Sequence, residues 1–352
     1  MIKKKQKIAV GMSGGVDSSV SAALLLKQGY DVIGVFMKFS DNKDGENVCC
    51  SLESKMDAER VCRKLGIKLY VMNMQVNFKK KVIDDFICKY KSGKTPNPCV
   101  LCNRYIKFGD FIKKAKLLKC DFVATGHYSK VKKNRKGVVS LLKGKDKNKD
   151  QSYFLNQLKQ TQLKHIMFPV GGYTKDQVRK LAKKYGLSTA SKKESQEVCF
   201  VPDNNLSKFL KSKIKFQQGE MKEFGTKNIL GLHKGLPLYT IGQRKGIGLP
   251  GGPWYVAELD MKKNVLWVTK DQSQIDSKTL SIKKINWMVE EPPLPTKVKC
   301  KVRYRTAEVS ATITKKANKY IVQFNKPIRA ITSGQFAVFY KGQECLGGGE
   351  IS

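Results

Sequence analysis

The segment that most limits what this chain can fold into is the octapeptide Gly11–Ser18, Gly-Met-Ser-Gly-Gly-Val-Asp-Ser. It follows a short apolar run, Ile8–Val10, and precedes apolar residues at helical spacing from Val16 to Leu24. Glycines let a backbone approach phosphate oxygens closely, and the free amides at a helix start carry partial positive charge. An ordinary strand-to-helix turn needs one glycine rather than this cluster. The segment therefore predicts a phosphate-binding loop, in which we expect Asp17 to help hold a magnesium ion on a triphosphate.

Strand and helix signals alternate over the first part of the chain, which we assign to one domain, residues 1–205. Apolar runs such as Val32–Phe36 and Asp121–Ala124 predict strands, and the apolar spacing within Ala58–Leu65 and Val178–Tyr185 predicts helices. Strands separated by amphipathic helices indicate an α/β domain with a parallel sheet covered on both faces. Ligands of such sheets bind beyond the carboxyl ends of the strands, where the glycine-rich loop lies.

The character of the chain changes near Gly219. Glycines become frequent and short strands follow, as at Trp254–Glu258 and Val265–Thr269, which predicts a small mixed or β domain over residues 206–279. Residues 280–352 contain further runs of alternating apolar and polar residues, typical of a small antiparallel β-barrel.

One run in this last part combines an apolar and a basic face. From Lys297 to Arg305, apolar residues alternate with Lys or Arg. The whole chain has 68 Lys and Arg against 29 Asp and Glu, a net charge of +39, which favours a nucleic acid as partner. We expect the basic face to contact it. The alternative is an edge strand kept soluble by its lysines, because lysines are spread over the whole chain.

The ten cysteines do not form the pattern of a secreted disulfide protein. They are scattered from Cys49 to Cys345 in a chain long enough to form a core without disulfides, which predicts a reducing, cytoplasmic location. No stretch has the length and apolar character of a membrane span, so we expect a soluble protein with no membrane partner.

Two cysteines stand where chemistry is expected. Cys99 and Cys102 follow Pro98 at an expected helix start, which favours the thiolate form that attacks electrophiles. A single Cys-x-x-Cys is weak support for structural zinc, and two unreactive thiols are the alternative. Cys199, between Val198 and Phe200, is more often a core residue when it is considered alone.

Considered together, the motifs resemble one known family. The Ser-Gly-Gly-x-Asp-Ser loop is similar to that of ATP pyrophosphatases, which activate a carbonyl oxygen as its AMP ester and release pyrophosphate. Five further motifs follow in order, and with them the whole chain resembles the tRNA-specific 2-thiouridylases: Asn97–Asn103, Thr125–Tyr128, Lys149–Leu155, Ser195–Phe200 and Gly242–Gly246. The resemblance implies ATP-dependent sulfur transfer to carbon 2 of the wobble uridine in tRNAs for Lys, Glu and Gln. It also implies an upstream sulfur-relay protein or cysteine desulfurase as partner.

The resemblance implies roles for single residues. Cys199 would carry sulfur as a persulfide, and Cys102 would be the nucleophile that releases it and forms a transient disulfide with Cys199. The ATP-binding residues would be Gly11, Met12, Ser13, Gly14, Gly15, Val16, Asp17 and Ser18, with Met37 and Gly126 on the adenosine side. The flipped target base would lie against Asn97, Pro98 and Cys99. The contacts to tRNA would be made by His127, Lys149, Asp150, Gln151, Arg303, Tyr304 and Gln335.

Cys99 departs from the common pattern of the family, in which an Asp at this position is thought to assist proton transfer. The departure leaves two mechanisms open. One is a persulfide relay, in which Cys99 is a third thiol. The other is an iron–sulfur cluster with one open iron, held by Cys99, Cys102 and Cys199.

Two other classes of function also remain open. An amide-forming ligase uses the same kind of loop with ammonia, but the chain offers no Cys–His pairing for a glutaminase among its three histidines, His127, His165 and His233. An RNA-binding protein without catalysis would account for the basic run but would leave the phosphate-binding loop without a purpose.

Overall fold

The computed structural model describes residues 5–40, 51–192 and 198–352. Its N-terminal part is built on a five-stranded sheet with the order β3-β2-β1-β4-β7, in which every pair is parallel. The strands are β1 (Lys7–Gly11), β2 (Asp31–Lys38), β3 (Leu69–Asn73), β4 (Phe122–Ala124) and β7 (Ile166–Met167). The parallel α/β sheet expected from the alternating signals is confirmed.

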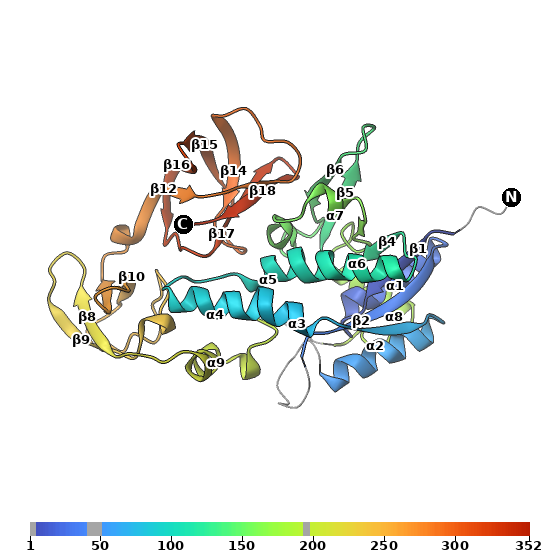
Figure 1. Ribbon diagram of the computed structural model, residues 1–352, viewed down its shortest axis with the longest axis horizontal. Coiled ribbons are helices and arrows are strands. Elements are labelled where there is room, and N and C mark those ends of the chain that lie inside the picture. The colour runs from blue at the N-terminus through green and yellow to red at the C-terminus, as the bar shows by residue number, and fades with distance from the viewer. Residues whose placement is uncertain (1–4, 41–50, 193–197) are drawn as a thin grey trace.

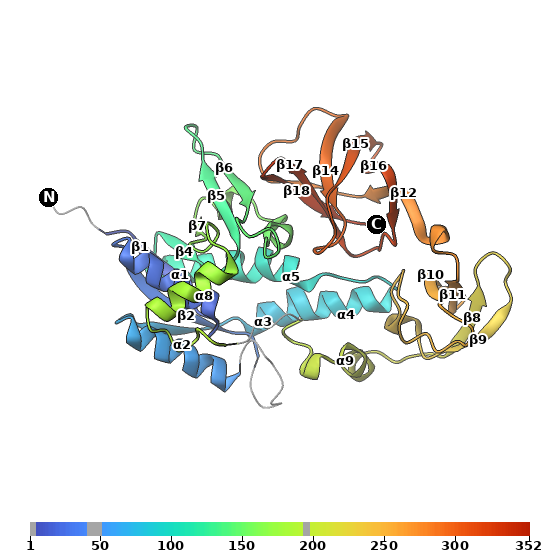
Figure 2. The same ribbon diagram turned by 180° about the vertical axis from the view of Figure 1, so that it is seen from behind.

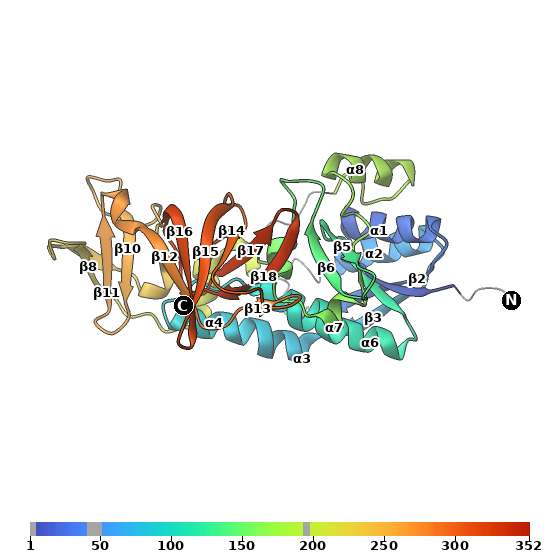
Figure 3. The same cartoon turned by 90° about the horizontal axis from the view of Figure 1, so that it is seen from above.

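Helices cover both faces of this sheet because its central strands are apolar on both sides. Ile8 and Val10 of β1 belong to one core with the helices α1 (Val16–Lys27), α2 (Leu52–Lys64) and α8 (Lys175–Lys184). Ala9 belongs to the other core, with α6 (Phe111–Leu117). Figure 3 shows α1 and α8 on one side of the sheet and α6 on the other.

Two long helical runs extend from this domain beneath the rest of the molecule (Figure 1). The first consists of α3 (Gln75–Phe78), a π-helical stretch over Lys79–Ile83 and α4 (Asp84–Lys91). The second begins with α5 (Pro98–Leu101), continues as π-helical turns over Cys102–Asp110 and ends as α6. The residues at its start are ones that helix starts prefer. Asn97 is the N-cap residue, and Pro98, which lacks a backbone N–H, occupies the first turn.

A second, four-stranded sheet lies at the opposite end of the molecule from β1 (Figure 1). After α9 (Leu206–Lys213), its order is β10-β11-β8-β9, with β11 and β8 parallel and the other pairs antiparallel. This agrees with the small mixed or β domain expected there. Its strands are β8 (Gly219–Glu223), β9 (Ile229–His233), β10 (Tyr255–Asp260) and β11 (Val265–Thr269).

The C-terminal part is an antiparallel sheet with the order β12-β16-β15-β14-β17-β18. An isolated bridge between Ile282 and Ile351 brings the first strand beside the chain end, so the sheet curls as expected for a barrel. β13 (Asn286–Trp287) pairs with β18. The other strands are β12 (Asp276–Ile282), β14 (Thr296–Lys301), β15 (Val309–Lys316), β16 (Lys319–Arg329), β17 (Phe336–Lys341) and β18 (Glu344–Glu350).

Two features of this sheet differ from the expectation. The hairpin β5 (Ser129–Lys133) and β6 (Val139–Lys143) belongs to it, because β6 pairs with β18 (Figures 1 and 2). The basic strand ends at Lys301 rather than at Arg305, because the chain turns after that residue.

The domain boundaries at 205/206 and 279/280 stay a prediction. Within the described ranges, no helix is both long and apolar enough to cross a membrane.

Candidate functional site

The glycine-rich loop lies between β1 and α1, at the carboxyl edge of the parallel sheet. Gly14 has φ +71, and a Cβ there would lie 2.2 Å from the backbone oxygen of Ser54, so only glycine fits without a shift. Ser18 Oγ accepts a hydrogen bond from Ser13 N at 3.2 Å and donates one to Gly15 O at 3.0 Å. These contacts fix the conformation of the loop at the start of α1, where the amides of the first turn have no partner within the helix.

A cavity of about 280 Å³, here called the loop cavity, opens beside this segment. Most of the expected ATP-binding residues line it: Gly11, Met12, Ser13, Asp17, Ser18, Met37 and Gly126. Gly14, Gly15 and Val16 complete the loop without lining the cavity, and the side chain of Val16 is buried in the core. Phe36, Phe39 and Thr125, which sequence reasoning missed, also line it. Aromatic rings beside a phosphate-binding loop suit a purine base.

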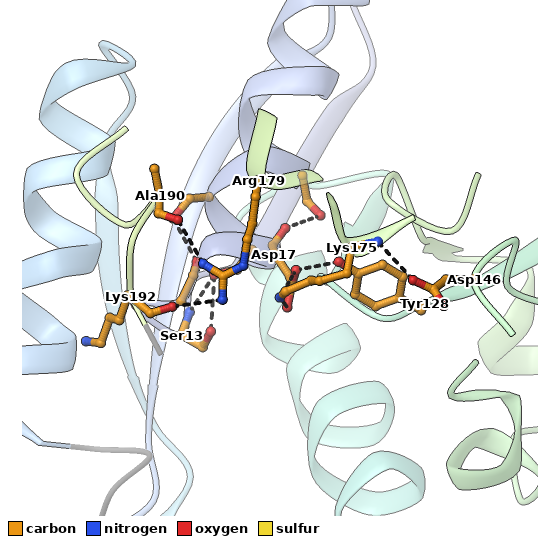
Figure 4. A network of polar contacts seen from close by, with 12 residues as sticks. Ser13, Asp17, Tyr128, Asp146, Lys175, Arg179, Ala190 and Lys192 are labelled. Atoms are coloured by element: carbon orange, nitrogen blue, oxygen red, sulfur yellow. Dashed lines mark hydrogen bonds and ion pairs between the residues drawn. The ribbon is translucent and has the colours of Figure 1, made fainter. Parts of the chain in front are cut away.

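Asp17 has a different environment from the one expected. Lys175 Nζ donates to both of its carboxylate oxygens, at 2.8 and 2.9 Å, and Tyr128 OH donates to Oδ1 at 2.7 Å (Figure 4). Lys175 is only 8% exposed, whereas the side chain of Asp17 is 29% exposed and lines the loop cavity. In this structure the carboxylate of Asp17 is paired with Lys175, and its expected role in holding magnesium stays a prediction.

A second cation lies near the loop. Arg179 is one turn beyond Lys175 on α8 and donates to Ala190 O at 2.9 Å and to Lys192 O at 3.3 Å. Figure 4 shows Lys175 and Arg179 side by side, with Ser13 and Asp17 next to them. Sequence reasoning missed both residues, because a Lys and an Arg four residues apart are unremarkable in so lysine-rich a chain.

A larger cavity of about 610 Å³, here called the thiol cavity, brings together cysteines that are far apart in the sequence. Cys99 is exposed, Cys102 is 7% exposed and Cys199 is half-buried. Cys102 belongs to the core on this side of the sheet, and Cys199 packs against the same core. The other expected residues that line the cavity are Pro98, His127, Lys149, Gln151, Arg303 and Tyr304.

The two cavities share three lining residues, Lys107, His127 and Gln151. The His127 ring packs against the rings of Phe108 and Phe168, with centroids at 5.6 and 5.9 Å. Burial, together with the charge of Lys107, holds the pKa of His127 well below its usual range, so its imidazole is neutral at pH 7. The two cavities therefore adjoin each other, with a neutral histidine, a lysine and a glutamine lining both.

Sequence reasoning also missed Lys107, although a signal was present. Cys99, Asn103 and Lys107 follow one another at intervals of four residues, the spacing that keeps side chains on one face of a helix. All three line the thiol cavity. The buried amide of Asn103 donates to Phe154 O at 3.2 Å.

Besides Gly14, Gly15 and Val16, three expected site residues lie outside both cavities. Asn97 is the N-cap residue of α5. The buried carboxylate of Asp150 accepts from Gly144 N at 3.0 Å and from Ser152 Oγ at 2.9 Å, so it holds its own loop together. Gln335 Nε2 donates to Thr95 O at 2.8 Å and ties the barrel to the segment before α5. Ser195, Gln196 and Glu197 of the motif around Cys199 lie outside the described residues.

The two arginines after β14 differ from each other. Arg303 is half-buried, and its guanidinium donates to Ala330 O at 2.8 Å and to Thr332 Oγ1. Burial lowers the pKa of Arg303. Arg305 is exposed at the rim of the thiol cavity. Tyr304, between them, packs on Phe154 with ring centroids 4.3 Å apart.

The three thiols do not form a metal site. Among the residues for which the structure gives positions, no group of three or more His, Cys, Asp or Glu side chains is placed to hold a metal ion. Cys99, Cys102 and Cys199 are all described, and they share a cavity without converging on one point. The arrangement therefore lends no support to an iron–sulfur cluster, which stays the alternative to the persulfide relay.

Comparisons with known families cover nearly the whole chain. Residues 6–203 match a family described as tRNA methyl transferase HUP domain. Residues 207–270 match a tRNA methyl transferase PRC-barrel domain, and residues 277–351 match an aminomethyltransferase beta-barrel domain.

Individual relatives are similar from end to end. The tRNA-specific 2-thiouridylase MnmA 1 of Thermoanaerobacter pseudethanolicus is 46% identical over 99% of this chain and 99% of its own. The tRNA-specific 2-thiouridylase MnmA of Streptococcus sanguinis is 44% identical over 99% of this chain and 95% of its own. Among solved structures, a 4-thiouridine synthetase–RNA complex with bound ATP gives a TM-score of 0.36 and 18% identity, over 59% of this chain and 50% of that one.

Proposed function

The chain belongs to the family of tRNA-specific 2-thiouridylases, and from this premise we propose that it transfers sulfur to carbon 2 of the wobble uridine in tRNAs for Lys, Glu and Gln. It is a sulfurtransferase that modifies tRNA uridine and uses ATP. One observation carries the finer proposal. The cavity beside the phosphate-binding loop and the cavity that holds Cys102 and Cys199 share Lys107, His127 and Gln151. A base in the second cavity can thus present O2 to a nucleotide in the first.

The first step is adenylation of the uridine. O2 attacks the α-phosphorus of ATP, the bond to the bridging oxygen breaks, and pyrophosphate leaves with the electron pair. The amides of Gly14–Ser18 and the cations Lys175 and Arg179 beside them suit the negative charge that develops on the leaving group. Magnesium stays an expected counterion of the phosphates.

The second step is sulfur transfer. The terminal sulfur of a persulfide on Cys199 attacks C2, and AMP leaves. The thiolate of Cys102 then attacks Cys199 Sγ and breaks the S–S bond, whose electron pair stays on the sulfur bound to C2. The products are the thiocarbonyl and a Cys102–Cys199 disulfide. The placement of both thiols in one partly buried cavity supports this route. A cluster-based delivery of sulfide has no such support, because the described residues offer no metal-ligand group.

The persulfide sulfur must come from outside the chain. Cys199 has to receive a sulfane sulfur in each cycle, so we propose an upstream sulfur-relay protein or cysteine desulfurase as partner.

Mass analysis of tRNA nucleosides after incubation of tRNA and ATP with the protein, loaded beforehand with a sulfane sulfur on Cys199, tests the function. We expect 2-thiouridine at the wobble position, dependent on ATP and accompanied by one pyrophosphate for each base modified. Omission of ATP is the control. Pyrophosphate release with no thiolated nucleoside would contradict the proposal and favour an amide-forming ligase, and binding without turnover would favour a non-catalytic RNA-binding protein.

The two arginines after β14 are expected to differ when each is replaced by alanine. Arg305→Ala should lower the slope of log Kd for tRNA against log salt concentration by about 0.7, because one phosphate contact is lost. Arg303→Ala should chiefly lower the free energy of unfolding, by about 1–3 kcal/mol, because Ala330 O and Thr332 lose their buried donor. Salt titrations of binding and thermal melts separate the two effects.

Arg63→Ala is the matched control for this pair. Arg63 is an exposed arginine on α2 and lines neither cavity. It should change neither the salt slope nor the melting temperature. An unchanged slope for Arg305→Ala would mean that this residue is merely a solvated surface charge.

A further inference from the structure

The proposed sulfur transfer leaves a disulfide in a place that is hard to reach. Cys102 is 7% exposed and belongs to the apolar core, and Cys199 is half-buried against the same core. Tyr304 and Phe154 line the same cavity, with their rings packed together. The rate of thiol–disulfide exchange depends on access of the attacking sulfur. A protein reductant therefore has poor access to a Cys102–Cys199 disulfide, which must be opened before the next turnover.

Cys99 is placed to reach this disulfide from outside. Its side chain is exposed, and it lines the same cavity three residues before Cys102 in one helical run. Helix geometry separates the Cα atoms of residues three apart by about 5 Å. Disulfides form at Cα separations of about 4.4–6.8 Å, so the spacing of Cys99 and Cys102 along the helix lies within the range of a disulfide.

We propose, on the basis of the function proposed above, that Cys99 is a resolving thiol that moves the disulfide from the buried Cys102–Cys199 pair to the accessible Cys99–Cys102 pair. The Cys99 thiolate attacks Cys102 Sγ, a Cys99–Cys102 bond forms, and the Cys102–Cys199 bond breaks with its electron pair on Cys199. Cys199 thereby becomes a thiolate that can accept the next sulfane sulfur. An external dithiol then reduces the Cys99–Cys102 disulfide and becomes a disulfide itself, so that atoms and electrons balance.

The other cysteines that the structure describes do not offer this route. Cys62, Cys120, Cys300 and Cys345 are buried, and burial raises the pKa of each thiol, to about 11 for Cys62 and about 12 for Cys345. Thiols held protonated in this way are poor nucleophiles. Cys88 is exposed, but it lies on α4 and does not line the thiol cavity. Of the described cysteines, Cys99 alone combines exposure with a place in the cavity.

Trapping of the disulfide after one turnover tests the proposal. The persulfide form of the full-length protein reacts once with ATP and excess tRNA in the absence of reductant, and N-ethylmaleimide then caps free thiols before peptide mass spectrometry. We expect a Cys99–Cys102 linkage with capped Cys199 in the wild type and in the control Cys88→Ser, and a Cys102–Cys199 linkage in Cys99→Ser. With a protein dithiol as reductant, later turnovers of Cys99→Ser should be at least about tenfold slower relative to its own first turnover. Reduction by a small phosphine between turnovers, with the phosphine removed before Cys199 is loaded again, should remove this difference.

Because Cys99 borders the cavity, its replacement can also weaken binding of the base. Weaker binding would slow every turnover by the same factor, so the rates of later turnovers are compared with the rate of the first. A wild type that keeps the Cys102–Cys199 linkage, or a Cys99→Ser variant with the wild-type ratio of later to first turnover, would overturn the resolving role. If Cys99→Ser thiolates tRNA once and forms no Cys102–Cys199 linkage, the disulfide-forming step of the proposed function is itself wrong. The two failures are therefore distinguishable.

Discussion

A Cys199→Ser variant is expected to release pyrophosphate with ATP and tRNA while forming no 2-thiouridine. Serine cannot carry a sulfane sulfur, whereas the loop cavity, where pyrophosphate would be formed, contains no part of Cys199. Thiolation should fall by about a thousand-fold or more, as when an enzyme loses the group that forms its covalent intermediate. Pyrophosphate release and nucleoside mass analysis, measured on the same samples, check the two halves separately.

Cys88→Ser is the matched control for this variant. It removes an exposed thiol from α4, outside the thiol cavity, and should leave both products at wild-type levels. Normal thiolation by Cys199→Ser would end the persulfide proposal. Loss of both pyrophosphate release and thiolation would instead mean that Cys199 takes part in adenylation.

A Gly126→Ala variant is expected to be impaired chiefly in adenylation. Gly126 follows β4, and a Cβ at this position would lie 2.7 Å from the backbone carbonyl carbon of Asp17 and 2.7 Å from the backbone nitrogen of Ser18. Neither atom can move without distorting the start of α1 and the loop before it. Overpacking of this kind costs about 1–3 kcal/mol. If the transition state bears this whole cost, kcat/KM for pyrophosphate release falls by about 5- to 150-fold.

Gly172→Ala tests whether the position matters rather than the added methyl group. A Cβ at Gly172 meets no atom within 4 Å, so this variant should release pyrophosphate at the wild-type rate. Thermal melts of both variants show whether the fold is kept. If Gly126→Ala is within twofold of the wild type, the close approach of this residue to the loop is not required for ATP use.

The parts of the fold that follow from local pattern were predictable. In β1, Ile8 and Val10 face one core and Ala9 faces the other, so both faces of this strand are apolar, as a buried parallel strand requires. The glycine-rich loop was recognisable because its backbone conformation and close packing, as at Gly14, demand particular residues at particular positions. Both signals lie within a few residues of the chain.

The parts that depend on distant partners were not predictable. The hairpin β5–β6 joins the C-terminal sheet through the pairing of Leu141 with Cys345, and nothing in either segment alone specifies the other. The alternation from Lys297 to Arg305 predicted one basic face. The chain turns after Lys301, and the half-buried Arg303 donates to Ala330 O from another segment. An alternation of apolar and basic residues predicts a strand with two different faces, but it does not determine the residue at which the strand ends.

The sequence by itself determined the chemical groups of this protein: the phosphate-binding loop, the thiols of Cys99, Cys102 and Cys199, and the family to which the chain belongs. Only the tertiary structure decided which groups meet. It paired Asp17 with Lys175, 158 residues away, where magnesium was expected, and it placed Lys107, His127 and Gln151 between the two cavities. The physical reason is that reactive groups are specified by residue type and local spacing. Their neighbours depend on how apolar faces of remote segments pack, and local spacing carries no record of that packing.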